Sequence, residues 1–313
     1  ILALAAPSAI VAGADWGERT IAAEDLAAAS AAGPELPDRV PKPGKAIPSG
    51  GSTGLPKLIV SPQPWAFPVA DQLPENFVGF QPNRIQLVTG PLYHNSPFSN
   101  AYRGLFYDHL LVVMERFDAR LALDLIERHR VSFMAVVPTV MKRILEVPDL
   151  NSRDLSSIEA LFHTGAPCPP WIKQRWIELV GGERVYEGFG GTESFGNAGI
   201  RGDEWMLHRG SVGRAYDSEI RILDDEGRDL EPGEVGEIFM RPRGKTGLTF
   251  EYVGTAQPRV VSGGFLSIGD MGWLDQDGYL FLADRRTDLI LTGGANVYPA
   301  EVESALSDHP QVR

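Results

Sequence analysis

The stretch "SGGSTGLPK" (Ser49–Lys57) decides how the rest of the chain is interpreted. It is rich in glycine and hydroxyl residues and ends in a lysine, which is typical of a loop that holds phosphate through backbone N–H groups and side chains. It does not match the GxxxxGK[ST] loop of nucleotide triphosphatases, because Pro56 replaces the second glycine and Leu58 replaces the metal-binding hydroxyl. The sequence therefore predicts a phosphate-binding loop of another design.

Composition and charge narrow the class of protein. The chain has 313 residues, of which 43% are hydrophobic and 22% charged, enough for two domains or for one large domain with a substantial core. A net charge of -12 argues against nucleic acid as a partner, although a few local cations could still hold a nucleotide. The single cysteine, Cys168, excludes an intrachain disulfide and predicts a reducing, cytoplasmic compartment.

The first dozen residues are apolar, and we interpret them as a buried strand or helix. The run is too short to span a bilayer, and no other stretch of the sequence approaches that length. Because no initiator Met is present, we expect the natural N-terminus to lie elsewhere.

Strand-like and helical patterns alternate through the middle of the chain. The strand-like stretches are "RIQLVTG" (84–90), "VSFMAVVP" (131–138) and "SIEALFHTG" (157–165). The helical stretches are "FDARLALDLIERHR" (117–130), "TVMKRIL" (139–145) and "WIKQRWIELV" (171–180), and the first of them places Leu121, Leu125 and Ile126 on one face. This alternation predicts a parallel sheet covered by helices.

The pattern changes after about residue 210. Residues 219–242 are predicted to form two strands, and a hairpin is predicted around Asp277–Gly278. A strand, a glycine turn and a helix with Pro299 in its first turn end the chain. We therefore predict an α/β fold with a large domain at 1–285, which includes an antiparallel β-barrel-like subdomain at about 210–285. The start of a small α+β C-terminal domain is predicted at 286–313.

Three further stretches contain candidate ligand-binding groups. "YEGFGGTES" (186–194) follows a strand and supplies the hydroxyl of Thr192 and the carboxylate of Glu193, a good Mg²⁺ ligand beside phosphate. "SIGD" (267–270) places Asp270 where a carboxylate could bridge ribose hydroxyls. "HTGAPCP" (163–169) is a tight turn that could lie against a purine. Taken singly, the first two are better explained as an ordinary turn and a surface hairpin with solvated charges, and the third could be a plain strand-to-helix connection.

Together and in this order, these stretches resemble the acyl-adenylate-forming superfamily, which includes acyl- and aryl-CoA synthetases, luciferases and adenylation domains of peptide synthetases. The opening stretch resembles that family's [ST]SG[ST]TGxPK loop from Gly51 through Lys57. "FGGTE" resembles the YGxTE element, and "SIGD" resembles TGD. "ADRRTDLILTGGANVYPAEVE" (283–303) is similar to the run GRxxDxIxxxGxNxxPxEVE. The resemblance extends from about Ser49 to the end of the chain.

The resemblance implies an ATP-dependent carboxylate–CoA ligase that uses ATP, Mg²⁺ and coenzyme A. The carboxylate of an organic acid attacks the α-phosphorus, pyrophosphate leaves, and the thiol of CoA then attacks the acyl-AMP. The protein's main task is to hold the reactants and neutralise the charge that moves to the leaving pyrophosphate.

The resemblance also implies roles for particular residues. Residues 49–57 would grip the β- and γ-phosphates, Thr192 the α-phosphate and Asp270 the ribose, while Phe189 would stack on adenine where the family usually has tyrosine. The residues implied for ATP or AMP are Ser49, Gly50, Gly51, Ser52, Thr53, Gly54, Lys57, Gly165, Ala166, Pro167, Glu187, Gly188, Phe189, Thr192, Asp270 and Arg285. The residues implied in catalysis are Lys57, Thr192 and Glu193, of which Glu193 is the metal ligand. The acyl pocket would include His94, Phe98 and Gly190, and Thr287 would be the hinge.

The match has departures. The loop reads Ser-Gly-Gly where Thr-Ser-Gly is usual, and Asp284 replaces the glycine before Arg285. The chain stops at Arg313, before the C-terminal lysine that the family uses in adenylation. We therefore expect this sequence to be part of a longer protein and, by itself, to bind ATP or acyl-AMP but to adenylate slowly.

Alternatives remain open at this point. The chain could be an adenylation domain that loads a carrier protein, or a non-catalytic nucleotide-binding regulator. The segments around residues 91–106 and 112–139 are similar to those of CoA ligases for fatty and bile or steroid-type acids, which would place the protein in lipid metabolism. Phe98, Tyr102 and Phe106 could line such a pocket or belong to the core, and His94 is as readily structural as functional. A homodimer is also compatible with the sequence.

Overall fold

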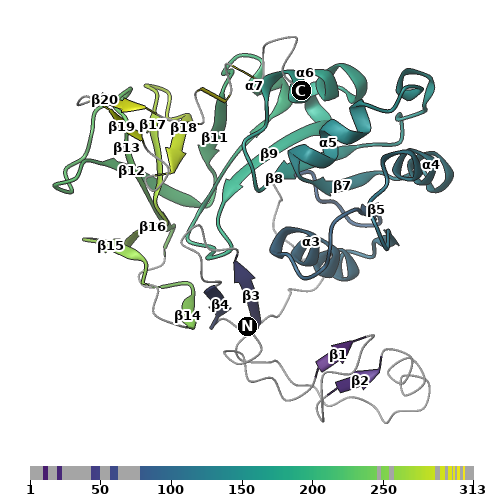
Figure 1. The fold of residues 1–313 in the computed structure, drawn as a ribbon, viewed down its shortest axis with the longest axis horizontal. Coiled ribbons are helices and arrows are strands. Elements are labelled where there is room, and N and C mark those ends of the chain that lie inside the picture. The colour runs from purple at the N-terminus through teal and green to yellow at the C-terminus, as the bar shows by residue number, and fades with distance from the viewer. Residues whose placement is uncertain are drawn as a thin grey trace. The chain divides into compact units, whose positions relative to one another are not determined.

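The computed structural model describes residues 10–12, 20–22, 44–49, 57–62, 78–244, 248–253, 257–285, 290–292, 295–297, 299, 302, 303 and 306 (Figure 1). The chain divides into two compact units, which are described separately. One comprises Ile1–Ala66 with Phe250–Gln257, and the other comprises Phe67–Thr249 with Pro258–Arg313. The domain boundaries predicted at 210 and 285 remain predictions.

The first unit contains two small sheets. β1 (Ile10–Ala12) and β2 (Thr20–Ala22) pair in parallel. β3 (Lys45–Ser49), β4 (Lys57–Ser61) and β14 (Glu251–Val253) form an antiparallel sheet in the order β14-β4-β3. The register of the β3–β4 hairpin sets Ser49 opposite Lys57. The predicted phosphate loop therefore connects two paired strands, although residues 50–56 themselves lie outside the described residues.

The second unit is built around a mixed sheet of thirteen strands. Its parallel half has the order β6-β5-β7-β8-β9. The strands are β5 (Ile85–Val88), β6 (Leu110–Val113), β7 (Phe133–Val136), β8 (Ala160–Thr164) and β9 (Val185–Gly190). The helices between them are α3 (Asn95–Phe106), α4 (Ala119–His129), α5 (Pro138–Leu145) and α6 (Pro170–Val180). The predicted fold class, a parallel sheet covered by helices, is confirmed.

Both faces of the parallel half are buried, as the continuous apolar run of β7 predicts. Met134 and Val136 face one hydrophobic cluster, whose fully buried members include Leu123 and Ile126 of α4, Met141 and Ile144 of α5, and Trp176 of α6. Phe133 and Ala135 face the other cluster, with Phe80 and Tyr107. The α4 helix begins where Asp118 accepts a hydrogen bond from the backbone N–H of Leu121 at 2.8 Å.

One detail of the helix prediction is wrong. Leu121 is 43% exposed, whereas Ala122, Leu123 and Ile126 are the buried residues of α4. The buried side of α4 is thus formed by Ala122, Leu123 and Ile126 with Leu125 partly buried, whereas Leu121 lies in the first turn beside the capping Asp118.

The antiparallel half continues the same sheet. β10 pairs with the last parallel strand, β9, and the order then runs β10-β11-β18-β17-β13-β16-β15, with β12 paired to β13. The elements are β10 (Asn197–Arg201), α7 (Gly202–Trp205), β11 (Ser211–Ala215), β12 (Ser218–Leu223), β13 (Gly236–Pro242), β15 (Arg259–Val261), β16 (Phe265–Ser267), β17 (Asp270–Leu274) and β18 (Leu280–Arg285). The predicted strand pair at 219–242 and the hairpin around Asp277–Gly278 are both confirmed.

A short hairpin follows the large sheet. β19 (Ile290–Thr292) pairs with β20 (Ala295–Val297), and the described residues 299, 302, 303 and 306 are helical, where the helix was predicted. No helix in the described part of the chain combines the length and the apolar character that a membrane span requires.

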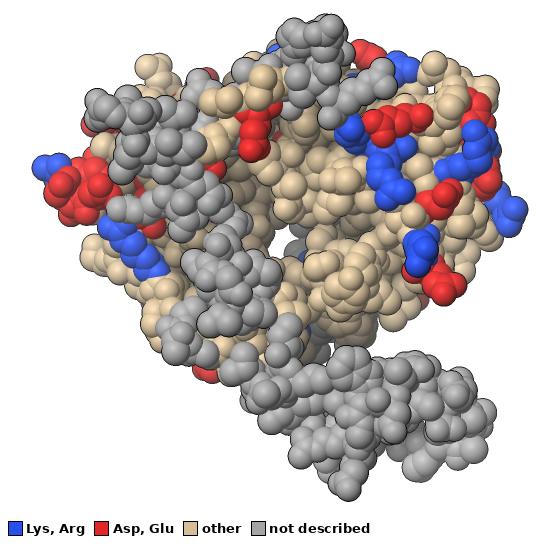
Figure 2. Space-filling model, viewed as in Figure 1, with Lys and Arg blue, Asp and Glu red and all other residues tan. Residues whose placement is uncertain are grey.

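Charged side chains of both signs are interspersed on the face shown in Figure 2. Elsewhere in the described part of the second unit, Arg153 contacts carboxylates of Asp124, Glu127 and Asp149 at 2.8 to 3.0 Å. The absence of a nucleic-acid partner stays a prediction.

Candidate active site

Three of the predicted site segments in the second unit follow the carboxyl ends of parallel strands. His94 comes after β5, Gly165 after β8 and Thr192 after β9 (Figure 1). Strands that run in parallel end at one edge of the sheet, which is the edge where open α/β sheets bind ligands. The sheet thus brings together segments that are far apart in the sequence.

The turn after β9 holds Thr192 and Glu193 in a fixed conformation. Ser194 adopts a left-handed φ of 54°, and its backbone N–H donates to the carbonyl of Gly191 at 3.0 Å. The hydroxyl of Thr249 donates to the carbonyl of Glu193 at 2.9 Å. Thr192 is half-buried, and Glu193 is 8% exposed.

The same turn lies beside the segment that leads to Asp270. A Cβ atom added to Gly191 would stand 2.8 Å from Oε2 of Glu193 and 3.2 Å from Cδ1 of Ile268, so the backbone of the turn lies close to Ile268. Gly269, with φ +91°, then turns the chain into β17, which Asp270 begins. Asp270 is half-buried and lies opposite Arg285 in the β17–β18 register. The predicted metal ligand and the predicted ribose ligand therefore come from neighbouring segments.

The two segments expected to frame adenine are also adjacent. In the parallel β8–β9 pair Thr164 lies opposite Gly188, and the Thr164 hydroxyl donates to the carbonyl of Gly188 at 2.7 Å. A Cβ atom on Gly188 would lie 2.7 Å from the ring of Phe162, which explains why glycine occupies this position. Beyond Thr164 the chain turns at Gly165, with φ +87°, and residues 165–167 are exposed at the sheet edge.

Among the predicted ATP-binding residues whose side chains the structure describes, Glu187 alone is buried inside the protein. It is 7% exposed and forms an ion pair with Lys173 of α6, which is 2% exposed. The Nδ1 atom of His163 lies 3.9 Å from Oε1 of Glu187. Lys173 was missed by sequence reasoning, because a lysine in an amphipathic helix is usually solvated.

His163 and Cys168 next to this pair are both held uncharged by burial. Burial lowers the pKa of His163 from 6.5 to about 4, and neither of its ring nitrogens has a hydrogen-bond partner among the described residues. Burial, reinforced by the charge of Glu187, raises the pKa of the Cys168 thiol to about 12. Neither side chain carries charge near neutral pH.

The segment predicted to border the acyl group forms the start of α3. His94 is exposed and directly precedes the helix. Phe98 and Tyr102 stack with ring centroids 5.7 Å apart, and Phe106 contacts Tyr102 edge-on at 5.1 Å. Spacing of four residues puts these three rings on one face of α3, partly open to solvent.

The side chains of several predicted site residues are not described by the structure. Residues 50–56 and Thr287 lie outside the described residues, and only the backbones of Ser49, Lys57 and Arg285 are described. Within the described residues, no group of three His, Cys, Asp or Glu side chains could hold a metal ion. A Mg²⁺ ion bound through Glu193 would therefore depend on substrate phosphates for its remaining ligands, as Mg²⁺ in nucleotide sites commonly does.

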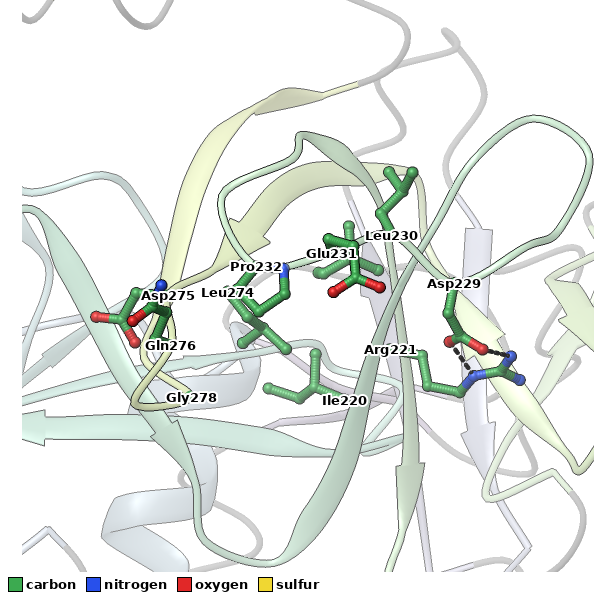
Figure 3. Close-up of a pocket in the computed structure, with 11 residues that line it drawn as sticks. Ile220, Arg221, Asp229, Leu230, Glu231, Pro232, Leu274, Asp275, Gln276 and Gly278 are labelled. Carbon is green, nitrogen blue, oxygen red and sulfur yellow. Dashed lines mark hydrogen bonds and ion pairs between the residues drawn. The ribbon is translucent and has the colours of Figure 1, made fainter.

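A separate hollow of about 260 Å³ lies in the antiparallel half (Figure 3). Its lining includes Ile220, Leu230, Pro232 and Leu274. Arg221 and Asp229 at its rim pair with each other at 2.6 to 2.7 Å. None of the predicted site residues lines this hollow, so it is distinct from the sheet-edge site.

Comparison with known proteins agrees with this geometry. Residues 13–247 match the model of the AMP-binding enzyme family, and the chain belongs to that family. The resemblance to acyl-adenylate-forming enzymes is thereby confirmed.

Two relatives and two solved structures show what the chain is similar to. It is 34% identical over 270 residues to 2-succinylbenzoate–CoA ligase of Geobacillus kaustophilus, covering 84% of this chain and 53% of that protein. It is 30% identical over 276 residues to the fatty acid–[acyl-carrier-protein] ligase ScoC of Streptomyces coeruleorubidus, covering 84% and 52%. The chain therefore spans about half the length of the curated relatives it matches.

Among solved structures, o-succinylbenzoate CoA synthetase of Bacillus subtilis in complex with its acyl-adenylate intermediate superposes with a TM-score of 0.79 at 28% identity, covering 99% of this chain and 64% of that one. Amide bond synthetase McbA of Marinactinospora thermotolerans gives a TM-score of 0.66 at 31% identity, covering 76% and 49%.

Proposed function

We propose that this chain is the ATP-binding part of a carboxylate–CoA ligase, which activates an organic acid as its acyl-AMP and then forms the CoA thioester. The observation that carries the proposal is the contact between the turn bearing Thr192 and Glu193 and the segment leading to Asp270. One ATP molecule needs a metal ligand for its phosphates and a carboxylate for its ribose, and these two segments supply both.

The proposed reaction divides the work among the residues as follows. Asp270 accepts hydrogen bonds from the ribose hydroxyls, and the exposed 165–167 turn and the end of β9 flank the adenine. Thr192 donates its hydroxyl to the α-phosphate. Lys57 and the loop before it bind the β- and γ-phosphates, where a positive charge favours departure of pyrophosphate.

Glu193 is the residue proposed to hold Mg²⁺, which when bound would neutralise phosphate charge. A Cβ atom built on Gly191 would lie 2.8 Å from Oε2 of Glu193, so this carboxylate stands close to the backbone of the turn. The structure of the Bacillus subtilis synthetase with ATP and magnesium ion, 30% identical, is a precedent for this pair of ligands in the family.

For the substrate, we propose an aromatic carboxylic acid, with 2-succinylbenzoate as the first candidate. Several relatives are 2-succinylbenzoate–CoA ligases, which favours this class over the fatty and bile-type acids and the role in lipid metabolism expected from the sequence. The aromatic face of Phe98, Tyr102 and Phe106 suits a benzoate ring. The similarity to the fatty acid–[acyl-carrier-protein] ligase ScoC supports a second candidate reaction, in which a fatty acid is loaded onto a carrier protein.

An acid and acceptor screen tests the proposal. The chain is incubated with ATP and Mg²⁺ and with 2-succinylbenzoate, benzoate, octanoate, cholate or acetate, with CoA or a pantetheine-bearing carrier protein as acceptor. Released AMP and the thioester are measured by mass spectrometry. We expect acyl-AMP or thioester with 2-succinylbenzoate and CoA, and none in Glu193→Gln. Product only with octanoate and carrier protein would favour the second candidate. ATP cleavage to ADP would overturn the ligase proposal.

A further inference from the structure

A buried ion pair joins the two segments expected to frame adenine. Lys173 lies in the first turn of α6, the helix that begins directly after the 165–169 turn. Glu187 lies on β9, immediately before the glycine at which that strand passes Thr164. The Nζ of Lys173 contacts Oε2 of Glu187, and the two side chains are 3% and 8% exposed. The Lys173–Glu187 contact therefore links α6, which follows the 165–169 turn, to β9, whose last residues are the other segment expected to frame adenine.

An aromatic ring and a neutral imidazole lie beside the ion pair. The Nζ atom of Lys173 lies 4.5 Å from the ring centroid of Trp205, and the fully buried His163 lies 3.9 Å from Oε1 of Glu187. Trp205 offers an aromatic face to the cation, and His163 is neutral. In such an interior, removing one partner leaves an uncompensated charge, so the remaining residue is strongly driven to move or to draw in water.

Two further contacts join β8 and β9 near Gly188. The Thr164 hydroxyl bonds the carbonyl of Gly188, and the Phe162 ring fills the space where a side chain on Gly188 would lie. Both fix β9 against β8 within the sheet. The Lys173 ammonium adds a contact from α6 to the Glu187 side chain of β9.

We propose that the Lys173–Glu187 ion pair is a clamp that holds the 165–167 turn and the end of β9 at a fixed separation, and so sets the width of the purine slot between them. The reference to a purine rests on the proposed function. Glu187 and Lys173 are positioning residues, and they act on the nucleotide through the backbones of the segments they join. Glu187 is thereby assigned to the support of the site rather than to direct contact with adenine.

Hydrogen–deuterium exchange without nucleotide tests the clamp independently of the ligase proposal. The variants are Lys173→Met, the double variant Lys173→Met/Glu187→Met, and Arg153→Met as a control. Arg153→Met breaks a partly buried ion cluster of the same unit, on the α4 side. The double variant removes both charges from the interior and keeps the proposal testable if the single variant does not fold.

We expect backbone exchange at 164–168 and 186–190 to become at least about tenfold faster in the clamp variants, and to stay at the wild-type rate in Arg153→Met. If ATP–Mg²⁺ binds the wild-type chain, its dissociation constant should rise at least about tenfold in the clamp variants and remain unchanged in the control. Unchanged exchange in a folded clamp variant would overturn the clamp. Faster exchange with no ATP binding by the wild type would support the clamp and count against the proposed function.

Discussion

The burial of His163 predicts that the protein loses stability in mild acid. The side chain is fully buried beside Glu187 and Lys173, close to Cys168, and neither of its ring nitrogens finds a hydrogen-bond partner among the described residues. Burial lowers its pKa from 6.5 to about 4 in the folded protein. In the unfolded chain the imidazole is solvated and regains its ordinary pKa.

The sign and size of the effect follow from these two values. At pH values between 6.5 and about 4, the imidazole of His163 binds a proton in the unfolded chain but not in the folded protein. The free energy of unfolding therefore falls as the pH drops through 6.5, and it stops falling near pH 4. Lowering the pH from about 7.5 to about 5.0 should reduce the stability contributed by this one group by about 2 kcal/mol.

Urea unfolding at these two pH values measures the effect. His163→Leu has a similar volume and no titratable group, so the stability it loses between the two pH values should be about 2 kcal/mol smaller than the loss in the wild type. Other groups contribute equally to both proteins and cancel in the difference. An equal loss in the two proteins would refute the assignment of a neutral, desolvated imidazole at this position.

Three other substitutions probe the packing that supports the site. Gly188→Ala would place a Cβ atom 2.7 Å from the Phe162 ring and should cost about 1–3 kcal/mol in thermal or urea unfolding; a cost near zero would show that β9 shifts freely. Thr164→Val removes the hydrogen bond to the Gly188 carbonyl and should cost about 1 kcal/mol, whereas Thr164→Ser should keep most of that stability; equal losses would argue against the bond. Trp176→Ala creates a cavity in the core between α5 and α6, where the indole N–H donates to the carbonyl of Met141 at 3.3 Å. It should lower the free energy of unfolding in urea by about 3–5 kcal/mol, and a loss below about 1 kcal/mol would contradict the buried position.

Local pattern was sufficient to predict most of the strands and helices of the parallel half, with the exceptions of α3 and β6. β7 is a short apolar run with proline close behind it, and α6 shows helical spacing of apolar residues, so both were identified. The α3 helix was not identified as a helix, because Pro97 and several polar residues hide its pattern; its apolar face appears only as the row Phe98, Tyr102 and Phe106. The first antiparallel strand, β10, was not identified either, because its five residues include only one large apolar side chain.

Short motifs identified the sheet-edge segments, since each combines glycine with one chemically distinctive side chain. The support behind those segments has no such signal. Lys173 and Glu187 are separated by a helix and a connecting turn, and their contact depends on how α6 packs on β9. The inward orientation of Glu187 likewise follows from the alternation of β9 and the position of α6, which sequence spacing alone does not fix.

Calorimetric titration of ATP into the chain, with Mg²⁺ and with EDTA, tests the central claim most directly. The site geometry predicts saturable binding that is at least about tenfold tighter with Mg²⁺, and loss of that Mg²⁺-dependent gain in Glu193→Gln. No saturable binding, or an equal gain from Mg²⁺ in the variant, would contradict the assignment of the turn at Thr192 and Glu193 to the phosphates and metal of ATP.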